Sequence, residues 1–167
     1  QVALSSAGFT FDTLLPTATM TTAQWIKASV NAFVGTSTDA PAGISGLSLA
    51  LSSAAGAANS WWDGSSFSGG APVYLAATVY TPGYPNDTWS WTRPPLTDGQ
   101  AYTLRTSATD YAGNNWTRNQ TPTVTYDASE PTAGIQVPVS GGFYNTLATI
   151  SGTSVDNVVV STIALSI

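Results

Sequence analysis

The sequence contains two diverged copies of one segment, and this repeat limits the folds open to the chain. Residues 9–18 read FTFDTLLPTA and residues 124–133 read VTYDASEPTA, an offset of 115 positions that matches Asp12 with Asp127. Two further matches follow in the same order at nearly the same offset: residues 34–39 with 151–156, and residues 49–52 with 163–166. A repeat of this length has the size of a β-sandwich domain.

The repeat predicts how the chain divides. One complete unit should occupy residues 12–127. Residues 1–11 align with the last strand of that unit and are predicted to be an orphan strand, either a donor strand or the end of a preceding repeat. Residues 128–167 align with its opening part and are predicted to form the first strands of a second, incomplete unit.

The chain is predicted to be all-β, because no window of useful length has the 3.6-residue period of an amphipathic helix. Within residues 12–127 we expect a sandwich of about seven strands. The predicted strands lie near residues 17–22, 28–37, 46–52, 73–80 and 88–93, within 96–114, and at 121–127. An Asp63-Gly64 turn should also join Trp61-Trp62 to Phe67 in a hairpin.

The strand within residues 96–114 is predicted to organise the sandwich. After the Thr97-Asp98-Gly99 turn, Tyr102, Leu104, Thr106 and Ala108 alternate with polar residues, which is the pattern of a half-buried strand. A Tyr just after an Asp-Gly bend occupies the place of the tyrosine corner in immunoglobulin-type sandwiches, where its hydroxyl binds a nearby backbone group. Leu96, Asp98 and Tyr102 are therefore the predicted structural corner.

Three motifs resemble the bacterial immunoglobulin-like tandem repeats of large extracellular surface proteins and adhesins. They are the junction Tyr-Asp-x-x-x-Pro-Thr at residues 126–132, the hairpin Trp-x-Gly-x-x-Phe at residues 62–67, and the turn Ala-x-Asp-x-Ala-Gly-Asn at residues 108–114. The resemblance implies an immunoglobulin-like fold at the cell surface and a structural or adhesive role without enzymatic activity. The segment 73–95 is longer than is usual in this family.

Composition excludes several classes of function. Only 8% of the residues are charged, and the net charge of −5 comes from nine acidic residues against four cationic ones. Four scattered cations cannot neutralise a row of phosphates, so nucleic-acid binding is not expected. No apolar run reaches the ~20 residues of a membrane span. Without His or Cys the usual catalytic triads cannot form, and we expect the protein not to be an enzyme.

Two kinds of ligand remain open. Calcium prefers several carboxylate and carbonyl oxygens, and the Asp residues at turns and unit junctions are weak candidates for it: Asp39, Asp110, Asp127 and Asp156. No Asp-x-Asp ligand loop is present, so we expect no required cofactor. Aromatic side chains can stack on sugar rings, which makes Trp61 and Trp62 the candidates for a carbohydrate site.

The unpartnered strands at both ends lead to the functional prediction. Exposed apolar strand edges favour pairing with another chain. We expect a head-to-tail homopolymer in which the first strand of one chain completes the last, incomplete unit of the next. The residues predicted to exchange are Val2, Leu4, Phe9, Phe11, Val137, Leu147, Ile150, Ile163, Leu165 and Ile167. The alternatives are an excerpt of a single-chain tandem-repeat adhesin, or a carbohydrate-binding module of a secreted enzyme.

Overall fold

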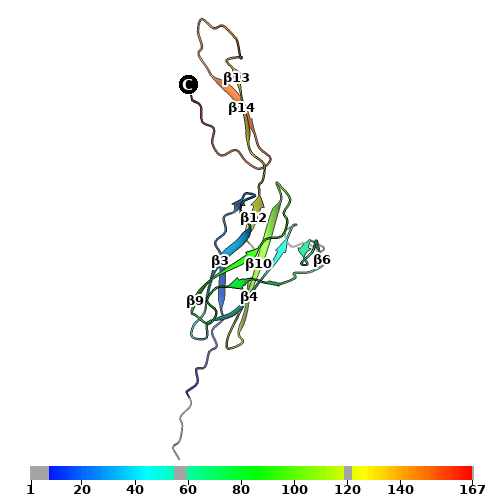
Figure 1. Cartoon of the computed structure of the whole chain (residues 1–167), viewed down its shortest axis with the longest axis vertical. Helices are drawn as coiled ribbons and strands as arrows, with labels where there is room; N and C mark the ends of the chain where they lie inside the picture. Colours follow the sequence, from blue (N-terminus) through cyan, green and yellow to red (C-terminus); the bar gives the residue numbers. More distant parts are fainter. Residues whose placement is uncertain (1–7, 55–59, 119–121, 167) are drawn as a thin grey trace, which may run out of the picture.

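The computed structural model describes residues 8–54, 60–118 and 122–166, and within them the chain is all-β. Two sheets form a sandwich, and a separate two-stranded sheet extends beyond it (Figure 1). Residues 8–11 leave the sandwich at the end opposite this hairpin. No helix that could span a membrane occurs among the described residues.

The smaller sheet of the sandwich has the strand order β1-β3-β9-β8. It consists of β1 (Thr17–Met20), β3 (Ala32–Thr38), β9 (Asn86–Thr92) and β8 (Thr78–Val79), and every neighbouring pair is antiparallel. Trp89 and Trp91 of β9 are both buried in the core, because positions i and i+2 of a strand share one face.

The larger sheet has the order β2-β12-β10-β4-β5-β6, with β11 also paired to β10 and β7 to β4. Its strands are β2 (Trp25–Ile26), β4 (Ile44–Ser52), β5 (Trp61–Trp62), β6 (Phe67–Gly69), β7 (Leu75–Ala76), β10 (Ala101–Asp110), β11 (Asn115–Arg118) and β12 (Thr123–Tyr126). β2 pairs with β12 in parallel, and the other neighbours are antiparallel. The short β5–β6 hairpin is the one predicted around Asp63-Gly64.

The core lies between these two sheets. β10 has the predicted alternation, with Tyr102, Leu104, Thr106 and Ala108 buried. The core residues of the two sheets form one cluster, which includes Phe33 and Trp89 from the smaller sheet and Leu49, Leu51, Leu104 and Val124 from the larger one. Burial on this scale stabilises the sandwich at roughly 25 cal/mol per Å² of apolar surface removed from water.

The predicted strand at residues 73–80 is wrong in one respect, because the structure divides it between the sheets. β7 pairs with β4, whereas β8 pairs with β9. Between them, the N–H of Ala77 donates to the carbonyl of Leu47 (2.8 Å), so the chain crosses from one sheet to the other at Ala77. β2 and β11 are two further strands, which lie outside the predicted strand ranges.

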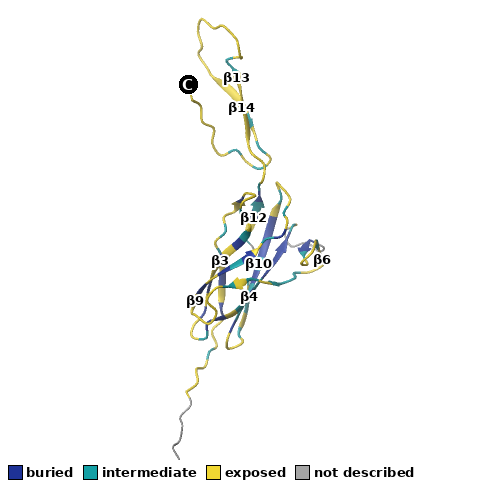
Figure 2. Ribbon diagram, viewed as in Figure 1, coloured by how far each residue is buried: buried dark blue, intermediate teal, exposed yellow. Residues whose placement is uncertain are grey.

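The third sheet pairs β13 (Thr132–Val137) with β14 (Ser151–Val155) and includes no residue of the sandwich. Residues 157–166 follow β14 without regular structure. Most residues of this hairpin are exposed, in contrast to the buried strands of the sandwich (Figure 2). The hairpin lies in the part of the sequence that was predicted to open a second unit.

Candidate functional site

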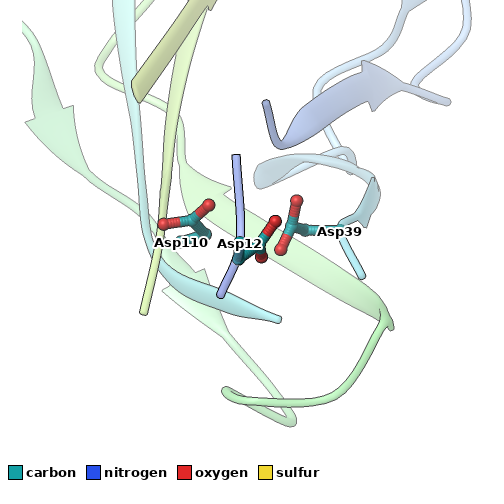
Figure 3. Close-up of side chains that lie close together, drawn as sticks. All are labelled: Asp12, Asp39 and Asp110. Carbon is teal, nitrogen blue, oxygen red and sulfur yellow. The ribbon is translucent and has the colours of Figure 1, made fainter. Parts of the chain in front are cut away.

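Three aspartates meet at the end of the sandwich where residues 8–16 enter it. Asp12 lies before β1, Asp39 follows β3, and Asp110 ends β10. One carboxylate oxygen from each lies within 4.8 Å of the other two. Figure 3 shows the Asp12 side chain between those of Asp110 and Asp39. Asp39 and Asp110 lie 27 and 98 positions after Asp12 in the sequence, and the fold brings the three residues together.

Backbone groups of the surrounding loops hold two of these carboxylates. Asp12 accepts hydrogen bonds from the N–H of Leu14 and of Ala42, both at 2.9 Å. Asp110 accepts from the backbone N–H and the side-chain amide of Asn114, both at 2.8 Å. The same amide also donates to the backbone carbonyl of Asp12 (3.2 Å), so Asn114 ties the end of β10 to the segment before β1.

Asp39 is the carboxylate that is poorly satisfied. Its side chain is 5% exposed, one oxygen accepts from the N–H of Gly43 (3.0 Å), and the other oxygen, Oδ1, is buried without a hydrogen-bond partner. Burial, followed by the negative charges of Asp12 and Asp110, raises the pKa of Asp39, and the Gly43 hydrogen bond opposes this only partly.

Asp110 behaves differently within the same cluster. Burial opposes its ionisation, but the hydrogen bonds from Asn114, Gly113 and Ala112 outweigh burial and lower its pKa. The pKa values of two carboxylates in one site are thus shifted in opposite directions. A third charge at Asp39 is favourable only if a proton or a cation compensates it.

The donor set suits a hard divalent cation. Calcium takes six to eight oxygen ligands at about 2.3–2.6 Å and accepts irregular geometry, whereas zinc in structural sites prefers Cys and His. The three carboxylates supply the type of oxygen ligand that calcium prefers, and one of these oxygens, Oδ1 of Asp39, has no hydrogen-bond partner. Asp12, Asp39 and Asp110 would hold the ion, which would link the loop before β1 to the ends of β3 and β10.

The predicted calcium candidates therefore lie in different places. The structure brings Asp39 and Asp110 together, and Asp127 and Asp156 are not part of the three-carboxylate cluster. Asp12 was not among the candidates, although the repeat pairs Asp12 with Asp127 and, at an offset of 117, Asp39 with Asp156. Asp127 and Asp156 each have one buried carboxylate oxygen without a partner, as Asp39 does.

The predicted corner has the expected hydrogen bond. Tyr102 is buried, and its hydroxyl accepts from the N–H of Thr97 at 2.7 Å. Leu96 is partly buried against the core. Asp98 points away from the corner to the following junction, where it accepts from the N–H of Ala128 (2.6 Å) and the hydroxyl of Ser129 (2.5 Å).

Hydrogen bonds lower the pKa of Asp98 to about 2; the bond from the Ala128 N–H contributes most, and those from Ser129, Asn157 and Gly99 add to it.

The two Trp candidates for sugar binding are not open platforms. Trp61 is 1% exposed, and the guanidinium of Arg105 lies 4.8 Å from the centre of its ring. Trp62 is partly buried, with its ring centre 5.2 Å from that of Phe67. The burial of Trp61 argues against a stacked pyranose there, because both faces of its indole are covered by protein.

The residues predicted to exchange between chains are exposed wherever the structure describes them, except Val137. Phe9 and Phe11 are 90% and 80% exposed and belong to no strand. Leu147, Ile150, Ile163 and Leu165 are exposed in or after the β13–β14 hairpin, and Val137 at the end of β13 is partly buried. Val2, Leu4 and Ile167 lie outside the described residues.

Comparison with known proteins does not identify a family. No protein-family model matches the sequence, and no curated protein matches it.

Proposed function

We propose that this chain belongs to an extracellular structural or adhesive protein built from immunoglobulin-like units, in which the strands of one unit complete another. The observation that carries this proposal is the shared register of two strand pairs, β1 with β3 and β13 with β14, which we call the two hairpins. β1 pairs Thr17 with Thr38 and Met20 with Gly35. Shifted by the repeat offsets of 115 and 117, these pairs become Thr132 with Val155 and Ile135 with Gly152, which are the pairs of β13 with β14.

The two hairpins differ in burial. In the sandwich the apolar residues of this region are in the core, whereas their repeat counterparts in the hairpin and the segment after it are exposed. The core residues are Ile26, Phe33, Leu49 and Leu51, and the counterparts are Phe143, Ile150, Ile163 and Leu165. A two-stranded sheet with an open apolar face is at best marginally stable alone. It becomes stable when further strands cover that face.

The strand order supports the immunoglobulin-like assignment. The order β1-β3-β9 corresponds to strands A, B and E of such sandwiches, and β4-β10-β12 corresponds to C, F and G. The tyrosine hydrogen bond at the start of β10 belongs to the same architecture. These likenesses, together with the three motifs of the sequence, are the basis for placing the protein at the cell surface.

The role follows from what the chain offers chemically. The carboxylate cluster is held by loop N–H groups at an end of the sandwich, where a cation would stiffen the entry of the chain into the unit. Stiff junctions suit a fibre, a stalk or the shaft of an adhesin. We propose no catalytic function, because the sequence contains neither His nor Cys and at least one oxygen of each clustered carboxylate accepts a hydrogen bond from a backbone N–H.

Sedimentation velocity over a range of concentrations, with electron microscopy of the same samples, tests the proposal. In the homopolymer form, the chain should grow into filaments, because a head-to-tail contact does not close on itself. Replacing Ile163 and Leu165 together by Asp should abolish growth. The matched control is Tyr80→Ser, which changes an exposed aromatic residue of the sandwich and should leave growth unchanged.

A chain that stays monomeric at every concentration would contradict self-assembly. The remaining form of the proposal is then a single-chain tandem array, in which neighbouring repeats of the same polypeptide supply the strands. That form predicts further copies of the Tyr-Asp-x-x-x-Pro-Thr junction in the gene that encodes this sequence. A gene without such copies, together with a monomeric chain, would refute the proposal in both forms.

A further inference from the structure

In the smaller sheet of the sandwich, a glycine and a tryptophan on neighbouring strands approach each other closely. Gly35 of β3 is directly opposite Trp89 of β9. A Cβ added at Gly35 would lie 2.0 Å from the carbonyl oxygen of Thr19 and 2.3 Å from the Trp89 indole. Only glycine leaves room for the ring here. The indole N–H donates to the carbonyl of Thr36 (3.1 Å), and Trp89 is 1% exposed.

The β13–β14 hairpin has the same glycine in the same backbone setting. Gly152 is the repeat counterpart of Gly35, and a Cβ added there would lie 2.2 Å from the carbonyl oxygen of Gly134, the counterpart of Thr19. Nothing among the described residues takes the place of the indole. Instead, an apolar pocket opens at this position, lined by residues that include Ile135, Ile150, Gly152, Ile163 and Leu165.

β14 also has a free edge beside this pocket. Its only strand neighbour among the described residues is β13, whereas β3 lies between β1 and β9. Both the backbone edge and the side-chain pocket that receive β9 in the sandwich are therefore present and uncovered in the hairpin. The sandwich and the hairpin of the same molecule thus offer an equivalent strand edge and an equivalent pocket beside it.

We propose that β14 is the docking site for an extended strand with the pattern of β9, antiparallel to β14, whose tryptophan enters the pocket over Gly152. The inference rests on the proposed function and deepens it, since it names the kind of strand that would pair with β14. The indole N–H would donate to the carbonyl of Thr153, the counterpart of Thr36. That bond favours tryptophan over phenylalanine.

A second side chain of the docking strand is specified by the same register. In the sandwich, Trp91 lies opposite Phe33, with ring centres 6.0 Å apart. The counterpart of Phe33 is Ile150, which is exposed at the rim of the pocket. The docking strand therefore carries tryptophan opposite Gly152 and a large apolar residue two positions later, because positions i and i+2 of a strand share one face.

The competing occupant is a second copy of this chain through Phe9 and Phe11. These two exposed aromatic residues are also two positions apart. Phenylalanine has no N–H for the Thr153 carbonyl, and the repeat aligns residues 9–11 with β12 rather than with β9. We therefore assign β14 to the tryptophan strand, and self-docking of residues 9–11 is an outcome that the test can detect.

The test uses the full chain and a synthetic peptide with the sequence Asn86–Thr92 of β9. Two-dimensional NMR of the ¹⁵N-labelled chain follows its titration, since this method detects weak binding. Saturable shifts are expected at Gly152 and Thr153. The peptide with Trp89→Ala should bind at least about tenfold more weakly, because a buried aromatic anchor dominates such contacts. Trp89→Phe should weaken binding a few-fold, and Ser90→Ala should have no effect.

A variant of the chain complements the peptides. Ile150→Asp should abolish the shifts, and cross-strand contacts between β13 and β14 show whether the hairpin is intact. Binding that is equally strong for the Trp89→Ala peptide, or shifts confined to the sandwich, would overturn the inference. So would the absence of saturable shifts at β14.

The outcomes separate this inference from the proposed function. A chain that assembles but does not bind the peptide keeps the proposed function and refutes the docking strand. If assembly is then lost on replacing Phe9 and Phe11 by Ser, self-docking is the correct alternative. A monomeric chain that binds the peptide with the expected dependence on tryptophan confirms the docking site and contradicts only the homopolymer.

Discussion

Replacing Asp39 by Asn should change the stability of the protein in opposite directions without and with calcium. Burial next to Asp12 and Asp110 raises the pKa of Asp39 above its usual 3.8, so the folded chain holds a proton there more tightly than the unfolded chain does. The stability from this proton is complete below the unfolded pKa and is lost as the pH rises through the folded pKa. At neutral pH, where Asp39 is ionised in the unfolded chain, its raised pKa in the fold therefore makes the metal-free protein less stable.

Asparagine removes that cost while it keeps the local contact. Its amide oxygen can still accept from the N–H of Gly43, and its NH₂ group can donate to a neighbouring carboxylate. Without calcium, the melting temperature of Asp39→Asn should be higher than that of the unaltered chain at pH 7. With calcium the order should reverse, because the variant lacks one of the three charges that bind the ion.

The size of the calcium effect follows from mass action. If the site has the Kd of about 0.1–1 mM of extracellular calcium modules, 10 mM calcium stabilises the unaltered chain by about 1.4–2.7 kcal/mol. For a domain of this size a change of 1 kcal/mol shifts the melting temperature by about 4 °C, which corresponds to a rise of about 6–11 °C. Asp39→Asn should show a rise of less than about 2 °C on the same scale.

Calorimetry in calcium and in a chelator measures both effects. The matched control is Asp63→Asn, which alters an exposed turn carboxylate that accepts five hydrogen bonds from Ser65, Ser66 and Ser68 and should retain the full calcium response. Magnesium at the same concentration should stabilise less, because it requires a tighter octahedral site. An equal calcium response in Asp39→Asn and the unaltered chain would refute the cation site. A lower melting temperature of the variant in chelator would refute the electrostatic reasoning.

Three further results are expected. Gly35→Ala should destabilise the sandwich by about 1–3 kcal/mol or more in urea unfolding, because its Cβ meets backbone and indole, whereas Gly46→Ala, with no atom within 4 Å, should have little effect. Equal losses would contradict this. Tyr102→Phe should cost about 1–2 kcal/mol by deleting a buried acceptor, and Tyr80→Phe, whose hydroxyl is exposed, should cost less than about 0.5 kcal/mol. The hydrogen bonds of Asp98 to the junction should persist as the pH falls to 4 and be lost as it falls through about 2. The reason is that a carboxylate with a lowered pKa contributes its stability above the pKa of the unfolded chain and loses it as the pH falls through the pKa of the folded chain. NMR signals of the junction that change already at pH 5 would disprove this prediction.

Local pattern was enough to predict β10 and β4. Tyr102, Leu104, Thr106 and Ala108 alternate with polar residues over the whole of β10, and the same alternation of Leu47, Leu49 and Leu51 marks β4. Alternation of apolar and polar residues involves only neighbours in the sequence, so a strand can be predicted from it without knowledge of the fold. The tyrosine hydrogen bond could be predicted for the same reason, because the turn and the Tyr that caps it are five residues apart.

The division of residues 73–80 between two sheets could not be predicted this way. Leu75 and Val79 are both suited to a strand, and nothing in the segment indicates which neighbour each will pair with. The crossing at Ala77 is decided by the backbone of β4, whose Leu47 carbonyl captures the Ala77 N–H. Such a partner is remote in sequence, and propensity gives no information about it.

The carboxylate cluster shows the same limit. Asp39 and Asp110 could be singled out because Asp39 follows a strand, Asp110 ends one, and each precedes a turn. Asp12 gave no such signal beyond its place in the repeat, and its role depends on the loop N–H groups of Leu14 and Ala42 that orient it. The identity of Asp39 as the unsatisfied member follows only from burial, which sequence does not give.

The two hairpins separate what local sequence determines from what the rest of the fold supplies. β1–β3 and β13–β14 share a register and a glycine that crowds the carbonyl of the opposite strand, so these features follow from the segment itself. Burial does not follow from it, since Phe33 is fully buried and Ile150 is exposed. What differs is the presence of β9 and of the facing sheet. The burial of the apolar residues in each strand pair therefore depends on strands far away in sequence. It follows that covering β14 should protect the amides of the hairpin from exchange without any change in its register.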